Sequence, residues 1–488
     1  TLHKHGAGTT IHKHGAGKSH GAGKSVAINR HQYILSRAGN IIPRTSAILD
    51  IHNLIQQNNN AILIKAQSGA GKSTLIACLL DMLEKDENSS PYIAFSCFIG
   101  GTEQSTTAFD ILKQLNMCVN DMLQNKLKGK NFIKKEKLAS NDIFLMQTQL
   151  MANIEEIGNQ FQKSILLVFD AVNELDVNSL SLTWLPLSPV KNCKYIFSTI
   201  DPESIINKNS VNGNATVAVY KNLCQRWKFD TVASEHFVYN LISMSTIERK
   251  ELLKMLVAEN NKTDENIEIS DAVCNLMINK RETSPLYLYL MARALKLEIA
   301  CNNDTYDEAM AMATVEKFPD DITKAYDLAL EDVENEIGEE KSNILLTSIW
   351  ATEGDLFYHQ IEKLLMLKQT FKGLKNVLDC ILRQRYVGNT DLVKVNFVHM
   401  QARDAVQRRY LQDECARKKR HKVLGDFFLQ LYTTATKDGD SIRSNSNTFA
   451  SSNSNTTSNS ARFAGKSHGA GKSHGAGKSH GAGKSHGA

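Results

Sequence analysis

The chain has 488 residues, of which 42% are hydrophobic and 22% are charged, and it is long enough for two or three packed domains. Its formal net charge is +5, but eight lysines and no acid lie in residues 1–25 and 464–488, so the remainder carries −3. A nucleic-acid binder carries positive charge on its folded body, so we do not expect nucleic acid as a partner.

Nine cysteines are scattered without a CxxC pair or a metal-type cluster of Cys and His, which favours reduced thiols and a cytoplasmic protein. The sequence has no apolar run near the roughly 20 residues that a membrane helix needs, and no secretory signal. Because the chain begins with Thr1 rather than Met, we expect a fragment or an incomplete gene model.

Both ends repeat a six-residue unit, GAGKSH, over 14–25 and again over 464–488. Such segments bury little apolar surface, so we predict disordered low-complexity tails. Each unit contains the Gly-Lys-Ser triplet of a phosphate-binding loop. The period of six, however, puts Lys or His where that loop has a small residue, and no strand precedes it. We assign the tails no nucleotide role; weak binding of metal or polyanions by their histidines is the alternative.

The folded part opens with an amphipathic helix whose apolar positions run from Ile48 to Ile55, with Thr45 or Ser46 as its cap. Four short apolar runs then alternate with helical stretches and are predicted to be strands: 61–66, 92–95, 165–169 and 195–197. This alternation indicates a parallel sheet covered by helices. From about residue 235 the pattern becomes helical, with a capping box formed by Ser245 and Glu248.

The strongest motif lies between the first strand and a helix predicted at 75–83, with Ala66 where the first glycine of a phosphate-binding loop is usual. Backbone N–H groups of such a loop point at phosphate oxygens. We expect Lys72 to reach the β- and γ-phosphates and the Ser73 hydroxyl to bind Mg²⁺. The residues predicted to bind the nucleotide here are Ala66, Gln67, Ser68, Gly69, Ala70, Gly71, Lys72, Ser73 and Thr74.

A strand that ends in a carboxylate is predicted about 95 residues after the phosphate loop. The run 164–170 is apolar and ends in Asp170, which we expect to hold the Mg²⁺. Glu174 is the candidate that orients or activates the attacking water, and a surface or helix-cap role is its alternative. Ser198 or Thr199, near the end of another predicted strand, is a candidate sensor of the γ-phosphate; a plain strand terminus is the alternative.

These motifs resemble the STAND class of signalling NTPases, and within it the NACHT-type proteins related to nephrocystin, telomerase-associated proteins and NACHT–WD-repeat proteins. The resemblance covers roughly residues 40–435. Besides the phosphate loop, it lies in the segments 98–107, 170–175, 184–186, 194–199, 284–288 and 397–399.

The resemblance implies that Pro285 packs near adenine and that His399 contacts the β-phosphate of bound ADP from a winged-helix domain. On the residues alone, Pro285 could simply start a helix and His399 could be a core histidine. Two positions depart from the family: Asn173 stands where an acid is common, and no Arg follows Ser198 and Thr199. Both departures favour slow hydrolysis.

The fold class we predict is α/β, a P-loop NTPase parallel sheet followed by a helical domain and a winged-helix domain. The predicted divisions are a tail at 1–25, the NTPase domain at 26–225, the helical domain at 226–335, the winged-helix domain at 336–436, a Ser/Asn-rich linker at 437–463 and a tail at 464–488.

The function we expect is that of an ATP/ADP-binding STAND-type switch using Mg²⁺, in which slow or absent ATP hydrolysis gates domain opening and oligomerisation. Self-association and protein partners would come through repeat or effector domains outside this chain. The alternatives are an oligomeric ATPase of the AAA or origin-recognition type and a scaffold that binds nucleotide without turnover.

Overall fold

A computed structural model describes most of the chain between residues 44 and 450. The described stretches are 44–57, 59–85, 90–100, 106–126, 142–186, 190–206, 213–229, 236–258, 268–302, 305–352, 356–365, 378–386 and 393–450. Both predicted GAGKSH tails and residues 451–463 of the predicted linker lie outside them. The chain divides into two compact units after Leu424. Among the helices described, none is both long and apolar enough to cross a membrane.

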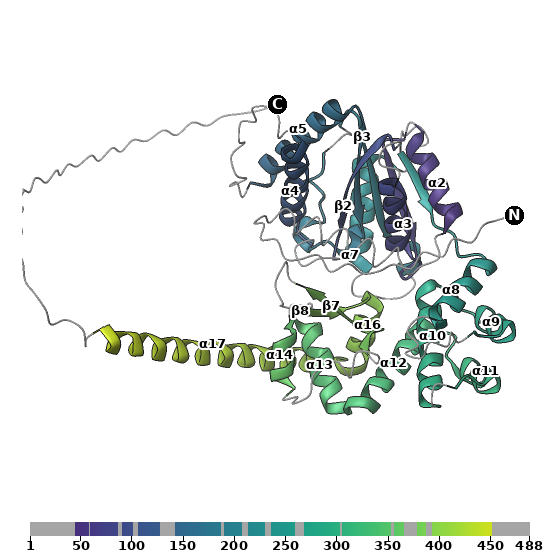
Figure 1. Ribbon diagram of the computed structural model, residues 1–488, viewed down its shortest axis with the longest axis vertical. Helices are drawn as coiled ribbons and strands as arrows, with labels where there is room; N and C mark the ends of the chain where they lie inside the picture. The colour runs from purple at the N-terminus through teal and green to yellow at the C-terminus, as the bar shows by residue number, and fades with distance from the viewer. Residues whose placement is uncertain are drawn as a thin grey trace, which may run out of the picture. The chain divides into compact units, whose positions relative to one another are not determined.

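A five-stranded parallel sheet forms the first part of the larger unit (Figure 1), in the order β2-β3-β4-β1-β5. All four predicted strands are confirmed. The strands are β1 (Ala61–Ala66), β2 (Tyr92–Phe98), β3 (Ser164–Asp170), β4 (Cys193–Ile200) and β5 (His236–Asn240). Because all pairings are parallel, the strands end at one edge of the sheet, where the connecting loops gather.

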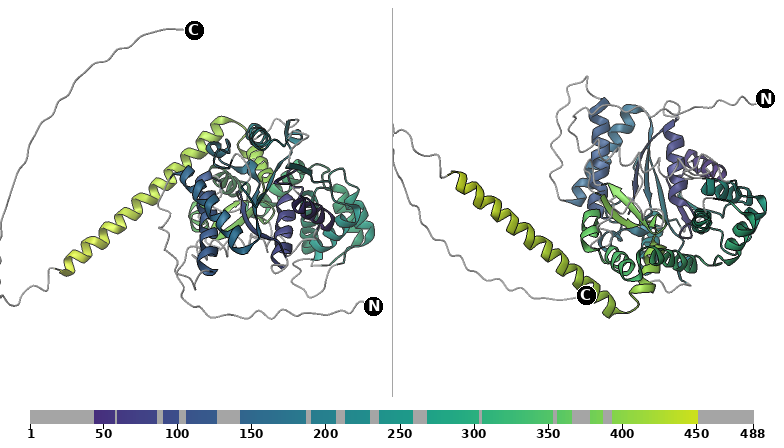
Figure 2. Two further views of the ribbon diagram at one scale, coloured as in Figure 1. Left: turned by 90° about the horizontal axis from the view of Figure 1, so that it is seen from above. Right: turned by 60° about the horizontal axis from the view of Figure 1, so that its bottom comes forward.

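Helices cover both faces of this sheet, as the right-hand view of Figure 2 shows. Along β1, Ile62 and Ile64 pack with α2 (Thr45–Gln56) and α3 (Lys72–Lys85). Ala61 and Leu63 pack on the opposite face, whose core comes from α4 (Ala108–Lys126), α5 (Ile143–Phe161) and α7 (Gly213–Trp227). Buried residues on both sides explain why the strands are continuous apolar runs in the sequence.

The fifth strand corrects the predicted boundary at residue 225. We predicted helix from about 235, whereas β5 pairs with β1 from His236 to Asn240 and so belongs to the sheet. Its sequence, His-Phe-Val-Tyr-Asn, belongs to an edge strand whose five side chains all stay partly or fully exposed. An edge strand does not need an apolar run, which is why its pattern was missed.

Helices follow the sheet: α8 (Thr246–Ala258), α9 (Asp271–Ile278), α10 (Pro285–Cys301), α11 (Glu308–Lys317) and α12 (Ile322–Ile337). The predicted capping box is confirmed. Ser245 N donates to Glu248 Oε2 at 2.7 Å, and Glu248 N donates to Ser245 Oγ at 3.2 Å, which satisfies two N–H groups at the start of α8.

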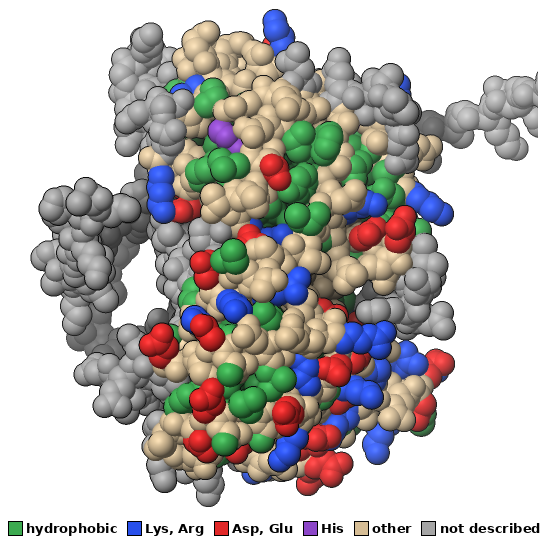
Figure 3. Space-filling model, turned by 90° about the vertical axis from the view of Figure 1, so that its right-hand side faces the viewer, with side chains coloured by type: hydrophobic (Ala, Val, Ile, Leu, Met, Phe, Trp, Pro, Cys, Tyr) green, Lys and Arg blue, Asp and Glu red, His purple; other side chains and the backbone are tan. Residues whose placement is uncertain are grey.

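On the face in Figure 3, acidic and basic side chains both occur over the lower part of the molecule.

A three-stranded antiparallel sheet follows, in the order β6-β8-β7. The strands and the helices around them are α13 (Glu339–Ala351), β6 (Leu356–Phe357), α14 (Tyr358–Leu364), β7 (Leu382–Tyr386), β8 (Val393–Phe397) and α16 (Met400–Tyr410). The predicted winged-helix domain falls on this region and stays a prediction. The end of α16 is bound to α12, because Arg409 donates to Glu334 from Nε at 2.8 Å and from Nη2 at 2.6 Å.

The last helix, α17 (Glu414–Ala450), contains the boundary between the two compact units. It passes residue 437, where we predicted that a Ser/Asn-rich linker begins. Helix formation is cooperative, so a helix that has started can continue through residues of weak propensity at low cost. An ion pair between Glu414 and Lys418, at 2.7 Å, lies in its first turns.

Candidate functional site

The loop between β1 and α3 is shaped by two glycines in the left-handed region, Gly69 with φ of 79° and Gly71 with φ of 89°. The Ala70 N–H donates to the Gln67 carbonyl at 3.3 Å, and the Leu75 N–H donates to the Gly71 carbonyl at 2.9 Å, where α3 begins. The first N–H groups of this 14-residue helix have no carbonyl partner within the helix itself, so its start favours an anion.

Lys72 is held by the loop to which it belongs. Its Nζ donates to the carbonyl oxygens of Ala66 at 3.1 Å and Gln67 at 3.0 Å. Burial lowers the pKa of Lys72 to about 8, against the opposing effect of nearby carboxylates, of which Asp170 is the strongest. A charged ammonium is therefore costly at this position until an anion accompanies it.

Asp170 ends β3 and is almost fully buried. The hydroxyl of Ser198, on the neighbouring strand β4, donates to Asp170 Oδ1 and accepts from the Ala171 N–H at 2.8 Å. Ser198 thus fixes the orientation of the carboxylate rather than lining the cavity itself. Its 0% exposure fits this supporting position.

The short 3₁₀ turn Val172–Glu174 carries the next two candidates. The Oδ1 atom of Asn173 accepts from the Ile200 N–H at 3.2 Å, so its side chain joins the ends of β3 and β4. Glu174 lies against Gly100, which follows β2: a Cβ built on Gly100 would be 2.0 Å from Glu174 Oε2. The positive φ of Gly100, 66°, favours glycine there, and any larger residue would also have to displace the Glu174 carboxylate.

The start of α10 contacts the phosphate loop directly. The Leu286 N–H donates to the Gly69 carbonyl at 3.4 Å. A Cβ on Gly71 would lie 3.7 Å from Pro285 Cγ, an ordinary van der Waals distance. Ser284 caps the helix, with Oγ accepting from the Tyr287 N–H, and Pro285 takes the first turn, where its missing N–H costs nothing.

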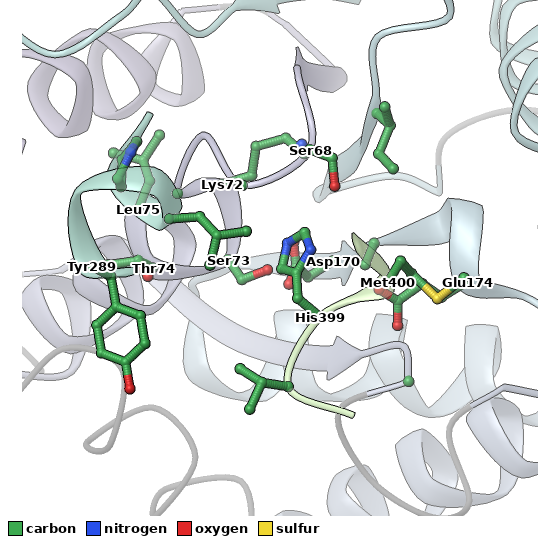
Figure 4. Close-up of a pocket in the computed structure, with 18 of the residues that line it drawn as sticks. Ser68, Lys72, Ser73, Thr74, Leu75, Asp170, Glu174, Tyr289, His399 and Met400 are labelled. Atoms are coloured by element: carbon green, nitrogen blue, oxygen red, sulfur yellow. The ribbon is translucent and has the colours of Figure 1, made fainter. Parts of the chain in front are cut away.

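His399 lies just before α16 and caps it, with Nδ1 accepting from the Gln401 N–H at 3.5 Å. A neutral ring that accepts at Nδ1 carries its proton on Nε2 and can donate from that atom. Figure 4 shows His399 with Ser73 and Asp170, together with the other labelled side chains of the cavity.

A cavity of about 370 Å³ is lined by residues from the five-stranded sheet and its helices, from α8 and α10, and from the segment between β8 and α16. Of the predicted site residues, ten line it: Ser68, Gly69, Gly71, Lys72, Ser73, Thr74, Asp170, Glu174, Pro285 and His399. Ala66, Gln67, Ala70 and Ser198 do not line it, although the first two hold Lys72 and the last holds Asp170.

Sequence reasoning missed several lining residues, namely Arg44, Met244, Leu252, Leu256 and Tyr289. No motif marks them. The capping box at the start of α8 did predict the helix that carries Leu252 and Leu256, but nothing in it indicated that this helix faces the phosphate loop.

Residues 48–198 match the family described as Nephrocystin 3, N-terminal. The core of the chain resembles an NTPase of NACHT-like type. The recognition made from the sequence is thereby confirmed for this segment, which spans the first four strands and the phosphate loop. Among curated proteins, the comparison found no match.

Solved structures similar to this chain include the Walker-type ATPase of Pyrococcus abyssi, at 14% identity and a TM-score of 0.36, covering 75% of this chain and 96% of that one. The ORC1 protein of Aeropyrum pernix in complex with DNA is 12% identical with a TM-score of 0.36, covering 76% and 94%. Domain III of the replication initiation protein DnaA from Thermotoga maritima is 14% identical with a TM-score of 0.30, covering 59% and 96%. Scores this low say nothing about activity.

Proposed function

We propose that this protein is a nucleotide-dependent switch of the STAND type, in which bound ADP holds the sheet, the helical part and the predicted winged-helix part together. One observation carries the proposal. Lys72 from the sheet part, Pro285 from α10 and His399 from the start of α16 all line one cavity. A ligand that fills it touches three parts of the chain, so its binding favours their closed arrangement.

The phosphate end of the cavity has the groups that a nucleotide diphosphate or triphosphate needs. The N-terminus of α3 supplies N–H donors, and Lys72 supplies a buried positive charge. Lys72 can exchange its two carbonyl partners for phosphate oxygens, which form stronger, charge-assisted hydrogen bonds. His399 can donate from Nε2 to the same phosphate group, which would connect α16 to the nucleotide.

The residues also fit Mg²⁺. Ser73, the second residue of α3, and Asp170, fixed by Ser198, both line the cavity, and hydroxyl and carboxylate oxygens are ligands that Mg²⁺ prefers. When bound, the ion supplies positive charge that offsets the charge of the phosphates.

Slow hydrolysis of ATP is the second function that a specific observation favours. Glu174 lines the cavity and can orient or deprotonate a water molecule. Asn173, which stands beside it, is neutral and is occupied by the Ile200 N–H, so the site gains no second acid from this position. A slow ATPase would reset the switch, and exchange of ADP for ATP would release α10 and α16 for oligomerisation.

The test is the nucleotide content of the purified full chain, measured by chromatography after denaturation, beside Lys72→Ala and His399→Ala. We expect near-stoichiometric ADP in the parent and none in Lys72→Ala. For His399→Ala we expect faster release of a fluorescent ADP analogue. His359→Ala is the matched control, because this exposed histidine lies on α14 in the same part of the chain, outside the cavity lining.

Two results would contradict the proposal in different ways. A parent that carries no nucleotide and binds neither ADP nor ATP with Mg²⁺ is a scaffold with an idle phosphate loop. If the parent and His399→Ala both bind ADP and release it equally fast, the bound nucleotide is not coupled to α16. The switch would then be refuted, whereas nucleotide binding would stand.

A further inference from the structure

The helix α17 carries a dense positive charge near its start. Five of the six residues 417–422 are lysine or arginine, and the sixth is a histidine. Both arginines donate hydrogen bonds to oxygen atoms of the protein. The lysines are exposed, namely Lys418, Lys419 and Lys422. Their charge is therefore available to a molecule that lies against this helix.

The next part of the same helix is hydrophobic. Seven of the ten residues 423–432 are apolar or aromatic. Leu424 is only 4% exposed, whereas Leu429 and Tyr432 are 62% and 69% exposed. Ten helical residues extend over about 15 Å, which is half the apolar thickness of a bilayer, so this part is too short to span one.

The exposed lysines and the exposed apolar residues share one face of α17. Positions 418, 422, 425, 429 and 432 follow one another in steps of four and three residues, the spacing that keeps side chains on one side of a helix. This exposed face is formed by Lys418, Lys422, Gly425, Leu429 and Tyr432, and it extends over about 21 Å. At its centre a Cβ built on Gly425 would meet no atom within 4 Å in the described part of the chain.

We propose that the exposed face of α17 binds the surface of a bilayer that contains anionic lipids. Its lysines lie at the headgroups, and Leu429 and Tyr432 lie at the boundary between headgroups and acyl chains. Amphipathic helices bind in the plane of a membrane in this way, by combining attraction to anionic lipids with burial of apolar side chains. Tyrosine suits that boundary, because its ring is apolar and its hydroxyl is polar.

The sequence after α17 has the same sign of charge. Residues 451–488 contain five lysines and arginines and no acid, so they too are attracted to an anionic surface. They contain only one large hydrophobic residue, Phe463, and so offer little that could cover the apolar part of α17. A nucleic acid would also attract the lysines, but it is held mainly through its phosphates and gives Leu429 no apolar partner. A lipid surface accommodates both halves of the exposed face.

The experiment measures binding of the full chain to vesicles of phosphatidylcholine and phosphatidylserine by co-sedimentation, beside vesicles of phosphatidylcholine alone. We expect the parent to prefer the anionic vesicles. Lys418→Gln with Lys422→Gln should weaken that binding about 10- to 30-fold, because each basic residue near an anionic surface contributes roughly fivefold. Leu429→Gln with Tyr432→Gln should weaken it by about 10-fold or more, through loss of apolar burial.

Each pair of substitutions has a matched control. Lys85 on α3 is exposed and pairs with an acid four residues before it at 2.7 Å, as Lys418 does, and Lys221 on α7 is exposed as Lys422 is. Lys85→Gln with Lys221→Gln changes the net charge equally and should leave binding unchanged. So should Ile242→Gln with Ile247→Gln, since these residues are 70% and 71% exposed outside α17.

Gly425→Trp tests the same face by a gain of binding, which a misfolded variant would not produce. The new ring enters open space on the exposed face, so we expect tighter binding to anionic vesicles. Unchanged binding in this variant would contradict the proposed orientation of the helix on the lipid.

Three results would overturn the proposal. Equal binding of the parent to both kinds of vesicle removes the role of anionic lipid. Parent-like binding in both α17 pairs shows that charge elsewhere, such as that of residues 451–488, attracts the vesicles. Tight binding of an oligonucleotide that depends on the lysines but not on Leu429 and Tyr432, with no binding to vesicles, assigns the exposed face to nucleic acid.

Discussion

Gly69 and Leu286 meet at the contact between the phosphate loop and α10, where a Cβ on Gly69 would lie 2.9 Å from Leu286 Cβ. The backbone of the loop therefore approaches the first turn of α10 at a distance that only glycine permits. The Leu286 N–H donates to the carbonyl of the same glycine. The close packing of α10 on the phosphate loop therefore depends on glycine at position 69.

Substituting this glycine should separate docking of α10 from backbone strain. Gly69→Ala and Gly71→Ala both place a Cβ on a left-handed residue, which costs about 1–3 kcal/mol each. Only the new Cβ of Gly69→Ala also clashes with α10, because the Cβ of Gly71→Ala would lie at an ordinary contact distance of 3.7 Å from Pro285 Cγ. We expect Gly69→Ala to unfold at lower temperature than Gly71→Ala and to expose α10 to hydrogen exchange. Equal exchange of α10 in the two variants would contradict this.

Ser198→Ala should weaken the metal-dependent part of nucleotide binding. The substitution removes the donor to Asp170 and leaves the Ala171 N–H without its acceptor. Groups that orient a metal ligand typically contribute about 10- to 100-fold to metal affinity. We expect ATP affinity to fall by about that factor with Mg²⁺ and to stay the same in EDTA. Ser204→Ala, which removes a bond to the Asp201 carbonyl, is the control; an equal loss in EDTA would refute a role through the metal.

Nucleotide binding should take up protons above about pH 8. Burial lowers the pKa of Lys72 to about 8 in the free protein, and bound phosphate raises it again by favouring the charged form. Between pH 8 and 10, Lys72 is therefore neutral before binding and protonated after it, and uptake approaches about one proton per ADP. The affinity should fall as pH rises through this window. Calorimetry in buffers of different ionisation enthalpy measures the uptake, which Lys72→Met should abolish.

The linkage between α12 and α16 should be measurable as a coupling energy. Glu334 accepts from Arg409 at two positions and also from the Tyr410 hydroxyl, and both charged side chains are less than one-third exposed. A double-mutant cycle with Glu334→Gln and Arg409→Met should give about 1–3 kcal/mol of coupling at pH 7. Additive effects of the two substitutions would show that the pair contributes nothing.

The ion pair of Glu334 and Arg409 should also make the stability of the fold depend on pH. The hydrogen bond from Arg409 lowers the pKa of Glu334 below its ordinary 4.5, so its contribution is full above pH 4.5 and is lost as pH falls through the lowered value. The stability difference between the parent and Glu334→Gln should therefore shrink below pH 4.5. A difference that stays constant down to pH 3 would contradict this.

The sequence predicted those parts of the fold in which neighbouring residues carry the signal. Strand β1 begins and ends where its apolar run does, and the loop after it was recognised because Lys72 and Ser73 follow closely spaced glycines. The bond between Ser198 and Asp170 was not predictable, since the carboxylate's partner depends on the order of strands in the sheet. Strand β5 was missed because it lies at an edge and is not an apolar run.

Arg44 is an example of a cavity residue that the sequence could not predict. Nothing distinguishes it locally from the other arginines, and its burial depends on the Ile242 carbonyl, far along the chain. The cavity likewise needs α8 and α10 to fold against the phosphate loop, which is a matter of tertiary packing rather than of any motif.

The helix α16 has one further consequence. It begins beside His399 in the cavity and ends at Arg409 and Tyr410, which are bound to Glu334 on α12. Its 11 residues form a rigid rod of about 16 Å between these two points. In the proposed switch, an outward movement of His399 that keeps this helix intact would displace its other end, so that release of the phosphate and strain on α12 would be a single mechanical event.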